Sequence, residues 1–206
     1  MKYKLQRMIQ IALLGLFIFL IIQGKVQLWV GLLIAGIVGS FLLGRFYCGW
    51  MCSINTVLVG ITWIKKKLKI KSIPVPKFLE NNIIRYGILL AFIGVFAFSM
   101  TSGKKLPVLP ALFGIGILTT LLFPEEFWHR YLCPYGTILH NSSRPSIMGL
   151  KIDPIACNNC TACVRVCPAK AVWKTREKHE ISKSDCLVCM NCEKVCRQNA
   201  ISYKQI

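Results

Sequence analysis

The sequence is poor in acidic residues and lacks the patterns expected of a self-sufficient enzyme. Its 206 residues include 8 Asp and Glu against 26 Lys and Arg, which gives a formal net charge of +18. There is no nucleotide-binding glycine fingerprint, because Gly31, Gly36, Gly39 and Gly44 lie in or at the end of one apolar stretch, where small residues serve helix packing. No residue set suited to acid–base or nucleophilic catalysis is visible. The substrate chemistry is therefore expected to come from a partner.

The hydrophobic content of 54% indicates that most of the chain lies in lipid. Stretches 8–22, 26–43, 83–100 and 106–123 hold no more than an end-placed charge. Each comes near the ~20 residues that cross a bilayer as a helix. A fifth stretch, 53–64, is shorter and runs directly into three lysines, so it is predicted to lie at the membrane interface.

Basic residues are distributed unevenly between the ends of these stretches. Most Lys and Arg residues of the first half either precede the first apolar stretch or lie between the second and the third stretch. They are Lys2, Lys4, Arg7, Arg45, Lys65, Lys66, Lys67, Lys69, Lys71 and Lys77. The other two loops contain only Lys25, Lys104 and Lys105. By the positive-inside rule, this predicts a multi-pass protein of the cytoplasmic (inner) membrane with cytoplasmic N- and C-termini. Aromatic residues are not interleaved with the basic ones, so no nucleic-acid partner is expected.

Eight cysteines near the C-terminus form two quartets with equal spacing. The motifs are Cys157-x2-Cys160-x2-Cys163-x3-Cys167-Pro168 and Cys186-x2-Cys189-x2-Cys192-x3-Cys196. This is the spacing of bacterial two-cluster ferredoxins, in which three cysteines hold one [4Fe-4S] cube and the cysteine after x3 ligates the other. The crossing predicts Cys157, Cys160, Cys163 and Cys196 on cluster 1 and Cys186, Cys189, Cys192 and Cys167 on cluster 2. The chain is therefore predicted to move single electrons.

Two other uses of these cysteines fit the spacing less well. Zinc sites use paired Cys-x2-Cys knuckles, usually one pair per site, which does not explain two evenly spaced quartets. A disulfide framework would need an oxidising compartment, whereas cluster ligation needs reduced thiolates.

An internal repeat indicates a second site at the membrane surface. Phe46-Tyr47-Cys48-x3-Cys52-x3-Thr56-Val57-Leu58 aligns with Phe127-Trp128-His129-x3-Cys133-x3-Thr137-Ile138-Leu139 at a constant offset of 81 residues. Each copy follows two predicted spans, so both copies should emerge on the same side of the membrane. Within each copy the first Cys or His precedes the second Cys by four residues, which places the pair on one helix face.

Cys48, Cys52, His129 and Cys133 thus form a candidate third site for an additional iron–sulfur cluster or a metal ion. The alternative is that these are core residues, since free cysteine packs as a small hydrophobe. Arg45 and Arg130 flank the two copies and could favour anionic thiolates or a quinone oxygen, but ordinary cytoplasmic-side anchors are the favoured interpretation. Trp50 and Trp128 are expected in an aromatic belt.

These features together predict two domains. Residues 1–145 are expected to form an all-α four-helix transmembrane bundle of two tandem helical hairpins. Residues 146–206 are expected to form a small α+β two-cluster bacterial ferredoxin-like domain.

The motifs resemble a known family. Arg45-x2-Cys48-Gly49-Trp50-x-Cys52, Trp128-x-Arg130-Tyr131-Leu132-Cys133-Pro134 and the two quartets are similar to membrane polyferredoxins related to the quinol dehydrogenase membrane subunit of periplasmic nitrate reductase and to the nitrous-oxide-reductase regulator. The resemblance covers nearly the whole chain. It implies four spans, a cytoplasmic ferredoxin domain, and electron transfer between a quinone pool or flavin partner and another redox protein. Ser53 and His129 depart from the family motifs, which commonly have Pro and Cys there.

Three functions remain open at this point. The first is an electron-transfer subunit of a membrane oxidoreductase complex. The second is a metal-handling or assembly factor, in which Cys48, Cys52 and Cys133 bind a soft ion such as Cu(I) and the clusters reduce it. The third is a redox-sensing regulator.

Overall fold

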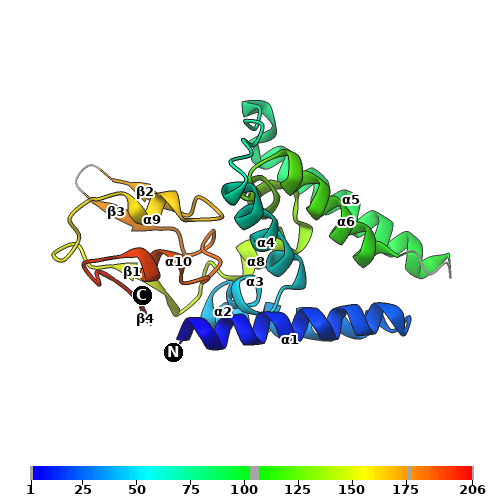
Figure 1. Ribbon diagram of the computed structural model, residues 1–206. Coiled ribbons are helices and arrows are strands. Elements are labelled where there is room, and N and C mark those ends of the chain that lie inside the picture. Colours follow the sequence, from blue (N-terminus) through cyan, green and yellow to red (C-terminus); the bar gives the residue numbers. More distant parts are fainter. Residues whose placement is uncertain (1, 103–106, 176–177, 206) are drawn as a thin grey trace.

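The structure, a computed structural model, describes residues 2–102, 107–175 and 178–205 (Figure 1). Helices form the first part of the chain, and two small sheets with two short helices form the second. The helices of the first part are α1 (Lys2–Ile22), α2 (Trp29–Leu43), α3 (Phe46–Trp50), α4 (Ser53–Lys67), α5 (Asn82–Thr101), α6 (Val108–Leu122), α7 (Glu125–Phe127) and α8 (Pro134–Ser142). Short 3-10 helices lie at Val26–Leu28 (η1) and Lys77–Leu79 (η2), and a π-helical turn at Trp128–Leu132 (η3).

Three helical segments are long and apolar enough to cross a membrane: Tyr3–Ile22, Val26–Leu43 and Asn82–Ser99. They correspond to three of the four predicted spans. The fourth stretch forms α6, whose 15 residues reach about 22 Å at 1.5 Å per residue, less than a ~30 Å hydrocarbon core. Leu106, where the predicted span begins, lies outside the described residues. Length and composition thus indicate membrane association for three helices.

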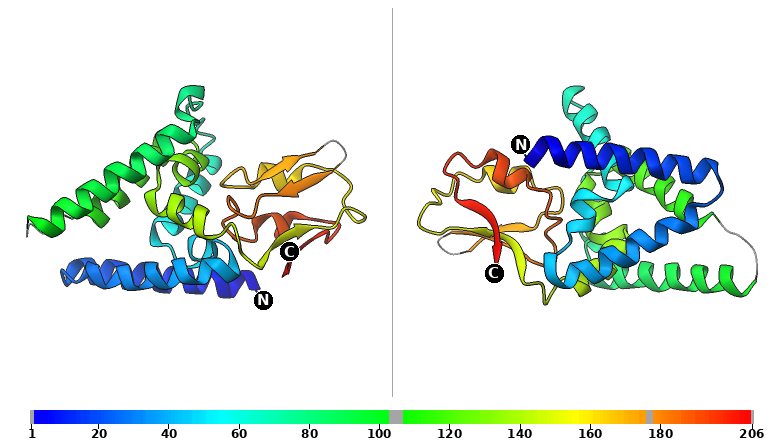
Figure 2. Two further views of the ribbon diagram at one scale, coloured as in Figure 1. Left: turned by 180° about the vertical axis from the view of Figure 1, so that it is seen from behind. Right: turned by 90° about the horizontal axis from the view of Figure 1, so that it is seen from below.

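The four apolar helices form two hairpins that extend away from the sheet-containing part (Figures 1 and 2). Their outward faces carry exposed large apolar side chains, including Ile11, Val38, Leu90 and Leu118, each at least 62% exposed. A lipid-facing surface has this composition, because the bilayer core offers no hydrogen bonds. The helical region therefore has the surface expected of a membrane protein.

The two hairpins contact one another mainly through the intervening helices α4 and α8. α4 contacts both α1 and α6, and α8 contacts both α2 and α5. Because α4 corresponds to α8 and α2 to α6 at the 81-residue offset, these contacts are equivalent pairs in the repeat. Each hairpin is thus followed by a helix that packs against the other hairpin.

Lys65 fixes α4 to the end of α6. The side chain is 6% exposed, and its Nζ donates to the carbonyl oxygens of Thr120 at 2.8 Å, Leu121 at 3.0 Å and Phe123 at 3.4 Å. The last carbonyls of a helix lack intrahelical partners and carry the negative end of its dipole, so a buried ammonium group stabilises them. This lysine was expected at the interface, and the structure instead uses it as a cap.

The second part has the same chain order twice, a strand, a cysteine loop, a short helix and a strand. Its elements are β1 (Met148–Ile152), α9 (Ala162–Arg165), β2 (Val172–Lys174), β3 (His179–Ile181), α10 (Asn191–Val195) and β4 (Ile201–Gln205). β1 pairs with β4 and β2 with β3, both antiparallel, with Leu150 opposite Tyr203 and Trp173 opposite Glu180. Pairing the first strand with the last brings the two halves together around one core (Figure 1).

The two halves also share unusual backbone conformations. Positive φ angles occur at Asn159 and Val188, at Thr161 and Met190, and at Lys170 and Asn199. Each pair is 29 positions apart, the same offset that relates the cysteines of the two quartets. Left-handed residues in a loop turn successive backbone N–H groups toward one concave side, which favours a bound anion. The repetition indicates two equivalent anion-binding loops.

Candidate metal centres

The first cysteine group lines a cavity in the part of the domain far from α3. This cavity is small, about 20 Å³, and Cys157, Cys160, Cys163 and Cys196 line it together with Ile152 and Ile201 of the paired strands β1 and β4. Cys196 comes from the second half of the domain and the other three from the first. The structure therefore brings together the four residues that the spacing assigns to cluster 1.

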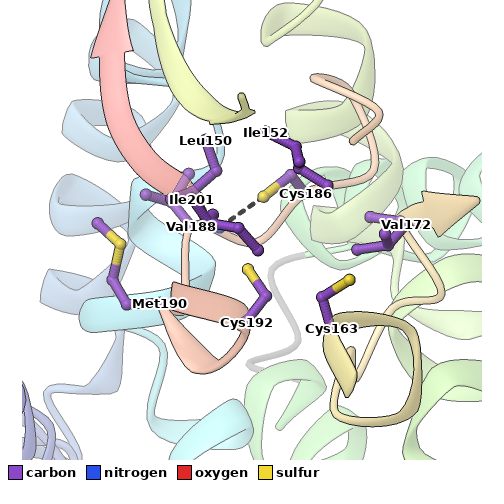
Figure 3. Close-up of a cluster of buried hydrophobic side chains, with 10 residues drawn as sticks. Leu150, Ile152, Cys163, Val172, Cys186, Val188, Met190, Cys192 and Ile201 are labelled. Atoms are coloured by element: carbon purple, nitrogen blue, oxygen red, sulfur yellow. Dashed lines mark hydrogen bonds between the residues drawn. The ribbon is translucent and has the colours of Figure 1, made fainter. Parts of the chain in front are cut away.

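The second group lines a separate small cavity of about 10 Å³. Its cysteines are Cys186, Cys189 and Cys192 from the second half and Cys167 from the first. In Figure 3 the sulfur atoms of Cys186 and Cys192 turn toward the same space, among apolar residues of the strands. The residues assigned to cluster 2 thus share one cavity, and their role as ligands remains a prediction.

Backbone N–H groups point at these sulfur atoms. The N–H of Ala171 donates to Cys167 Sγ at 3.2 Å, and that of Val188 donates to Cys186 Sγ at 3.4 Å. Such donors stabilise the negative charge of a thiolate or of a cluster sulfur and thereby influence its reduction potential. The loops therefore suit anionic sulfur.

Burial works in the opposite direction on the free thiols. It raises the pKa of Cys186 to about 12, with a further contribution from nearby Cys167. It likewise raises the pKa of Cys189 to about 12, and Cys186 and Cys167 add to the effect. Several thiolates cannot be buried side by side without positive charge, which iron supplies when a cluster binds. The four-thiol donor set fits a [4Fe-4S] cube.

No preformed single-ion site is found in the described part of the chain. No three His, Cys, Asp or Glu side chains there are gathered tightly enough to hold one metal ion, and this includes the two quartets and the set Cys48, Cys52, His129 and Cys133.

At the candidate third site, the structure brings three cysteines close together. Cys52 and Cys133 occupy equivalent positions immediately before α4 and α8, with similar backbone angles. Burial raises the pKa of Cys52, and neighbouring Cys48 and Cys133 raise it further. Burial also raises the pKa of Cys133 to about 12, again with a contribution from Cys48. Opposing this, the N-termini of the two helices favour thiolates, and the Gly136 N–H donates to Cys133 Sγ at 3.3 Å.

His129 lies on the π-helical turn η3 and is 5% exposed. Burial, together with the charge of Arg45, lowers the pKa of His129 to about 3, so the imidazole is neutral. Its Nε2 atom is buried and has no hydrogen-bond partner among the described residues. A neutral imidazole with a free nitrogen can act as a ligand. The membership of His129 in one site with Cys48, Cys52 and Cys133 remains a prediction.

Arg45 lies beside these cysteines and is not the surface anchor expected from the sequence. It is 1% exposed, and its Nη2 lies 3.9 Å from Cys48 Sγ. Its Nη1 donates to the carbonyl oxygens of Ser184 and Asp185, both at 3.5 Å, and its Nε has no partner in the described part of the chain. A buried guanidinium without a carboxylate partner is costly unless other negative charge is near. Its position three residues before Cys48, about one helical turn, is the sequence signal that indicates this role.

The repeat motif touches the loop of the second quartet directly. A Cβ atom on Gly49 would lie 2.3 Å from the Leu187 carbonyl oxygen and 3.0 Å from the Cys189 backbone nitrogen, so only glycine fits there. Trp50 Nε1 donates to the Val188 carbonyl at 3.0 Å. Cys48, Cys52 and Cys189 also pack around one apolar cluster with Leu187. The third site and the cluster 2 site are therefore neighbours.

Two residues at this junction differ from expectation. Trp50 was predicted in an aromatic belt, but its indole joins α3 to the loop of the second quartet. Trp128 was predicted in the same belt, but it is 2% exposed and packs against Ile54 and Leu58 of α4. An aromatic side chain contributes most apolar contact area when it is buried, as Trp128 is, and an indole N–H needs an acceptor, which Val188 provides for Trp50.

Asp185, next to Cys186, is a junction residue that the sequence did not reveal. Its Oδ1 lies 2.9 Å from His140 Nδ1 and 3.8 Å from Arg85 Nη1. Burial opposes ionisation of this carboxyl, but the hydrogen bond and charge of His140 outweigh it and hold the pKa of Asp185 below its usual range. The carboxylate thus connects the second quartet to α5 and α8.

Comparison with known families agrees with the repeat and with the quartets. Residues 25–71 and 106–152 each match the family described as "4Fe-4S binding domain", again at an offset of 81 residues. Residues 149–197 match the family described as "4Fe-4S dicluster domain". The tandem repeat is confirmed, and both of its copies belong to an iron–sulfur family. Together the iron–sulfur family matches cover residues 25–71 and 106–197.

Several curated proteins are similar over most of the chain. An uncharacterized protein of Methanocaldococcus jannaschii is 33% identical over 178 residues, covering 82% of this chain and 68% of that protein. The ferredoxin-type protein NapH of Haemophilus influenzae is 29% identical, covering 77% of this chain and 62% of NapH. The methylamine utilization ferredoxin-type protein MauN of Methylorubrum extorquens is 27% identical, covering 71% of this chain and 56% of MauN. The chain belongs to the membrane polyferredoxins of the NapH family, which are ferredoxin-type 4Fe-4S electron transport proteins.

Proposed function

We propose that this chain relays single electrons between a quinone pool or flavin partner and another redox protein, as a membrane-anchored subunit of an oxidoreductase complex. The observation that carries the proposal is the contact between the repeat motif and the loop of the second quartet, at Gly49 and Trp50. It connects the membrane part of the chain to the cysteine cavities without an intervening layer of protein. The two [4Fe-4S] clusters would supply one-electron chemistry when bound.

The burial of the cysteines supports an order for the relay. Cys186 and Cys192 are buried, and Cys189 packs with Cys48 and Cys52 near the membrane part. Cys160, by contrast, is exposed on the far side of the domain. We propose that electrons enter or leave on the membrane side near the second quartet, and that a soluble redox protein docks near Cys160.

The proposal includes topology and domain division. Residues 1–145 would cross the membrane four times as two hairpins, and residues 146–206 would lie in the cytoplasm with both termini. The equivalent contacts of α4 and α8 support this arrangement, because they place both repeat motifs at the same end of the hairpins. The basic residues near that end favour the cytoplasmic side.

The test begins with anaerobically purified full-length protein. Two cubes predict about eight irons and eight acid-labile sulfides per chain, and a reproducible excess of iron would indicate an occupied third site. Duroquinol and a reduced flavin are then added separately, and cluster reduction is followed by electron paramagnetic resonance. Reduction by dithionite but by neither quinol nor flavin would contradict the proposal.

Metal handling remains a second candidate because Cys48, Cys52 and Cys133 are soft ligands close enough to influence one another's pKa, although they are not gathered as a preformed single-ion site. Its test is addition of Cu(II) to the reduced protein. Stoichiometric formation of bound Cu(I), lost in Cys52→Ser, would favour an assembly factor over a relay.

A further inference from the structure

A cavity of about 470 Å³ lies where α1, α4 and the loop of the second quartet meet. Its lining includes Gln6 and Gln10 from α1, Asn55 from α4, and Cys189 of the cluster 2 site. Figure 2 shows the N-terminal end of α1 beside α10, at the end of the hairpin nearest the sheets. A ligand in this cavity would thus lie beside a predicted cluster ligand and at the end of a predicted span.

The floor of the cavity contains an acceptor that needs a donor. Asn55 is 2% exposed, and its Oδ1 has no hydrogen-bond partner in the described part of the chain. The neighbouring amides are directed elsewhere: Gln6 Nε2 donates to the carbonyl oxygens of Gly49 at 3.0 Å and Cys189 at 3.3 Å, and Gln10 Nε2 donates to that of Gly49 at 2.8 Å. A buried carbonyl without a donor costs about 1–3 kcal/mol, so this atom points to a ligand with a hydroxyl or N–H group.

The rim of the cavity is basic. Lys4, Arg7 and Lys194 line it and are exposed, and none of them forms an ion pair with the described carboxylates. Cations alone would suit a phosphate. However, a phosphate dianion accepts hydrogen bonds and cannot satisfy Asn55, and it would be repelled by a bound cluster, whose net charge is negative.

A neutral ligand with hydroxyl groups satisfies both parts of the cavity. Its hydroxyl can donate to Asn55 Oδ1, and its second oxygen can accept from a rim cation. The membrane side of the cavity includes Met8, which is 67% exposed, and Ile11 one turn further along α1 is 66% exposed. An apolar tail can therefore leave the cavity along the lipid-facing side of α1.

We propose that this cavity binds the headgroup of a quinol, with one hydroxyl donating to Asn55 Oδ1 and the ring beside Cys189. The site rests on the proposed function and adds its location to it. Oxidation of a quinol there breaks two O–H bonds and releases two electrons and two protons, leaving the quinone. One electron passes to each oxidised [4Fe-4S] group of the chain, and the protons leave to water past the exposed rim.

Photolabelling locates the site without depending on electron transfer. Full-length protein in nanodiscs is irradiated under reducing conditions with an azido-substituted quinol, and the labelled peptides are identified by mass spectrometry. We expect label within residues 2–10 and 53–59, competed by excess duroquinol. Asn55→Leu should weaken quinol binding about tenfold, the loss of one hydrogen bond, whereas the matched variant Asn141→Leu on α8 should leave it unchanged.

The outcomes separate the site from the function. Label in the apolar groove between α5 and α6, lined by Ile88, Phe92 and Ile115, would overturn the site while leaving quinol as electron donor. Displacement of the label by anionic phospholipid but not by duroquinol would assign the cavity to a lipid headgroup. Cluster reduction by duroquinol at an unchanged rate in a folded Asn55→Leu variant would also overturn the site. Specific labelling here, with no cluster reduction by quinol or by reduced flavin, would contradict the proposed function alone.

Discussion

Replacing Arg45 with glutamine should lower the reduction potential at the cluster 2 site more than at the cluster 1 site. The guanidinium is 1% exposed and lies 3.9 Å from Cys48 Sγ, with its other amino group on the carbonyls beside Cys186. Reduction adds a negative charge, which a nearby cation stabilises. Removal of the cation therefore disfavours the reduced state, and the potential falls.

The size of the effect follows from the range of the interaction. The 3.9 Å contact of Arg45 is with Cys48, whereas the cluster 2 cysteine that senses the Arg45 charge is Cys186. Two unit charges ~8–15 Å apart, the scale for an electron spread over a whole cluster, interact by about 1–2 kcal/mol at an effective dielectric constant near 20. Because a tenfold change in a one-electron equilibrium is 59 mV, this corresponds to a fall of about 40–90 mV.

The assay is a redox titration of anaerobic protein followed by electron paramagnetic resonance, with the cluster 1 signal as internal reference. Arg45→Lys keeps the charge and should recover most of the potential. Arg165→Gln removes an exposed charge on α9 and should leave the cluster 2 potential in place. Equal shifts of both clusters in Arg45→Gln, or a rise at cluster 2, would refute the electrostatic argument.

Three further predictions concern the crossed ligation of the clusters, the contact between Gly49 and the loop of the second quartet, and the membrane topology. Cys167→Ser should remove the cluster 2 signal and about four irons while leaving cluster 1, and loss of cluster 1 instead would show that ligation is not crossed. Gly49→Ala should destabilise the protein by about 1–3 kcal/mol in denaturant unfolding because its methyl group meets the loop of the second quartet, whereas Gly39→Ala, with nothing within 4 Å, should not. Reporter fusions after Lys25 and after Lys69 should report opposite sides of the membrane, and the same side for both would contradict the four-span topology.

Local pattern was sufficient to predict much of this fold. The quartets predicted which cysteines share a cavity, because the short spacing leaves a loop few ways to wrap a cube. The repeat was visible because both copies keep their Cys, His and Thr positions at one offset. Apolar length predicted three of the helices that can cross a membrane, while α6 is shorter than its apolar stretch suggested.

Contacts between distant segments could not be predicted in this way. Arg45 meets Ser184 and Asp185 some 140 positions later, and no local periodicity encodes such a pairing. A basic residue at the end of an apolar stretch usually anchors the helix at the membrane surface. Arg45 differs because the loop before Cys186 covers it in the folded chain. Trp128 was misjudged for the same reason, since α4 covers it only in the folded chain.

The exchange of α4 and α8 between the hairpins has a consequence for the order of assembly. When the first hairpin has entered the bilayer, α4 still lacks α6, which begins more than forty residues later. Contacts with such separation form late, because the intervening loop must close first. In the proposed topology the first repeat therefore stays incomplete, with its basic α4 end on the cytoplasmic side, until the second repeat is inserted. The contacts of α4 with α6 and of α8 with α2 can then form together. The cysteine-containing part, which follows them in the chain, can pack against these helices only after those contacts exist.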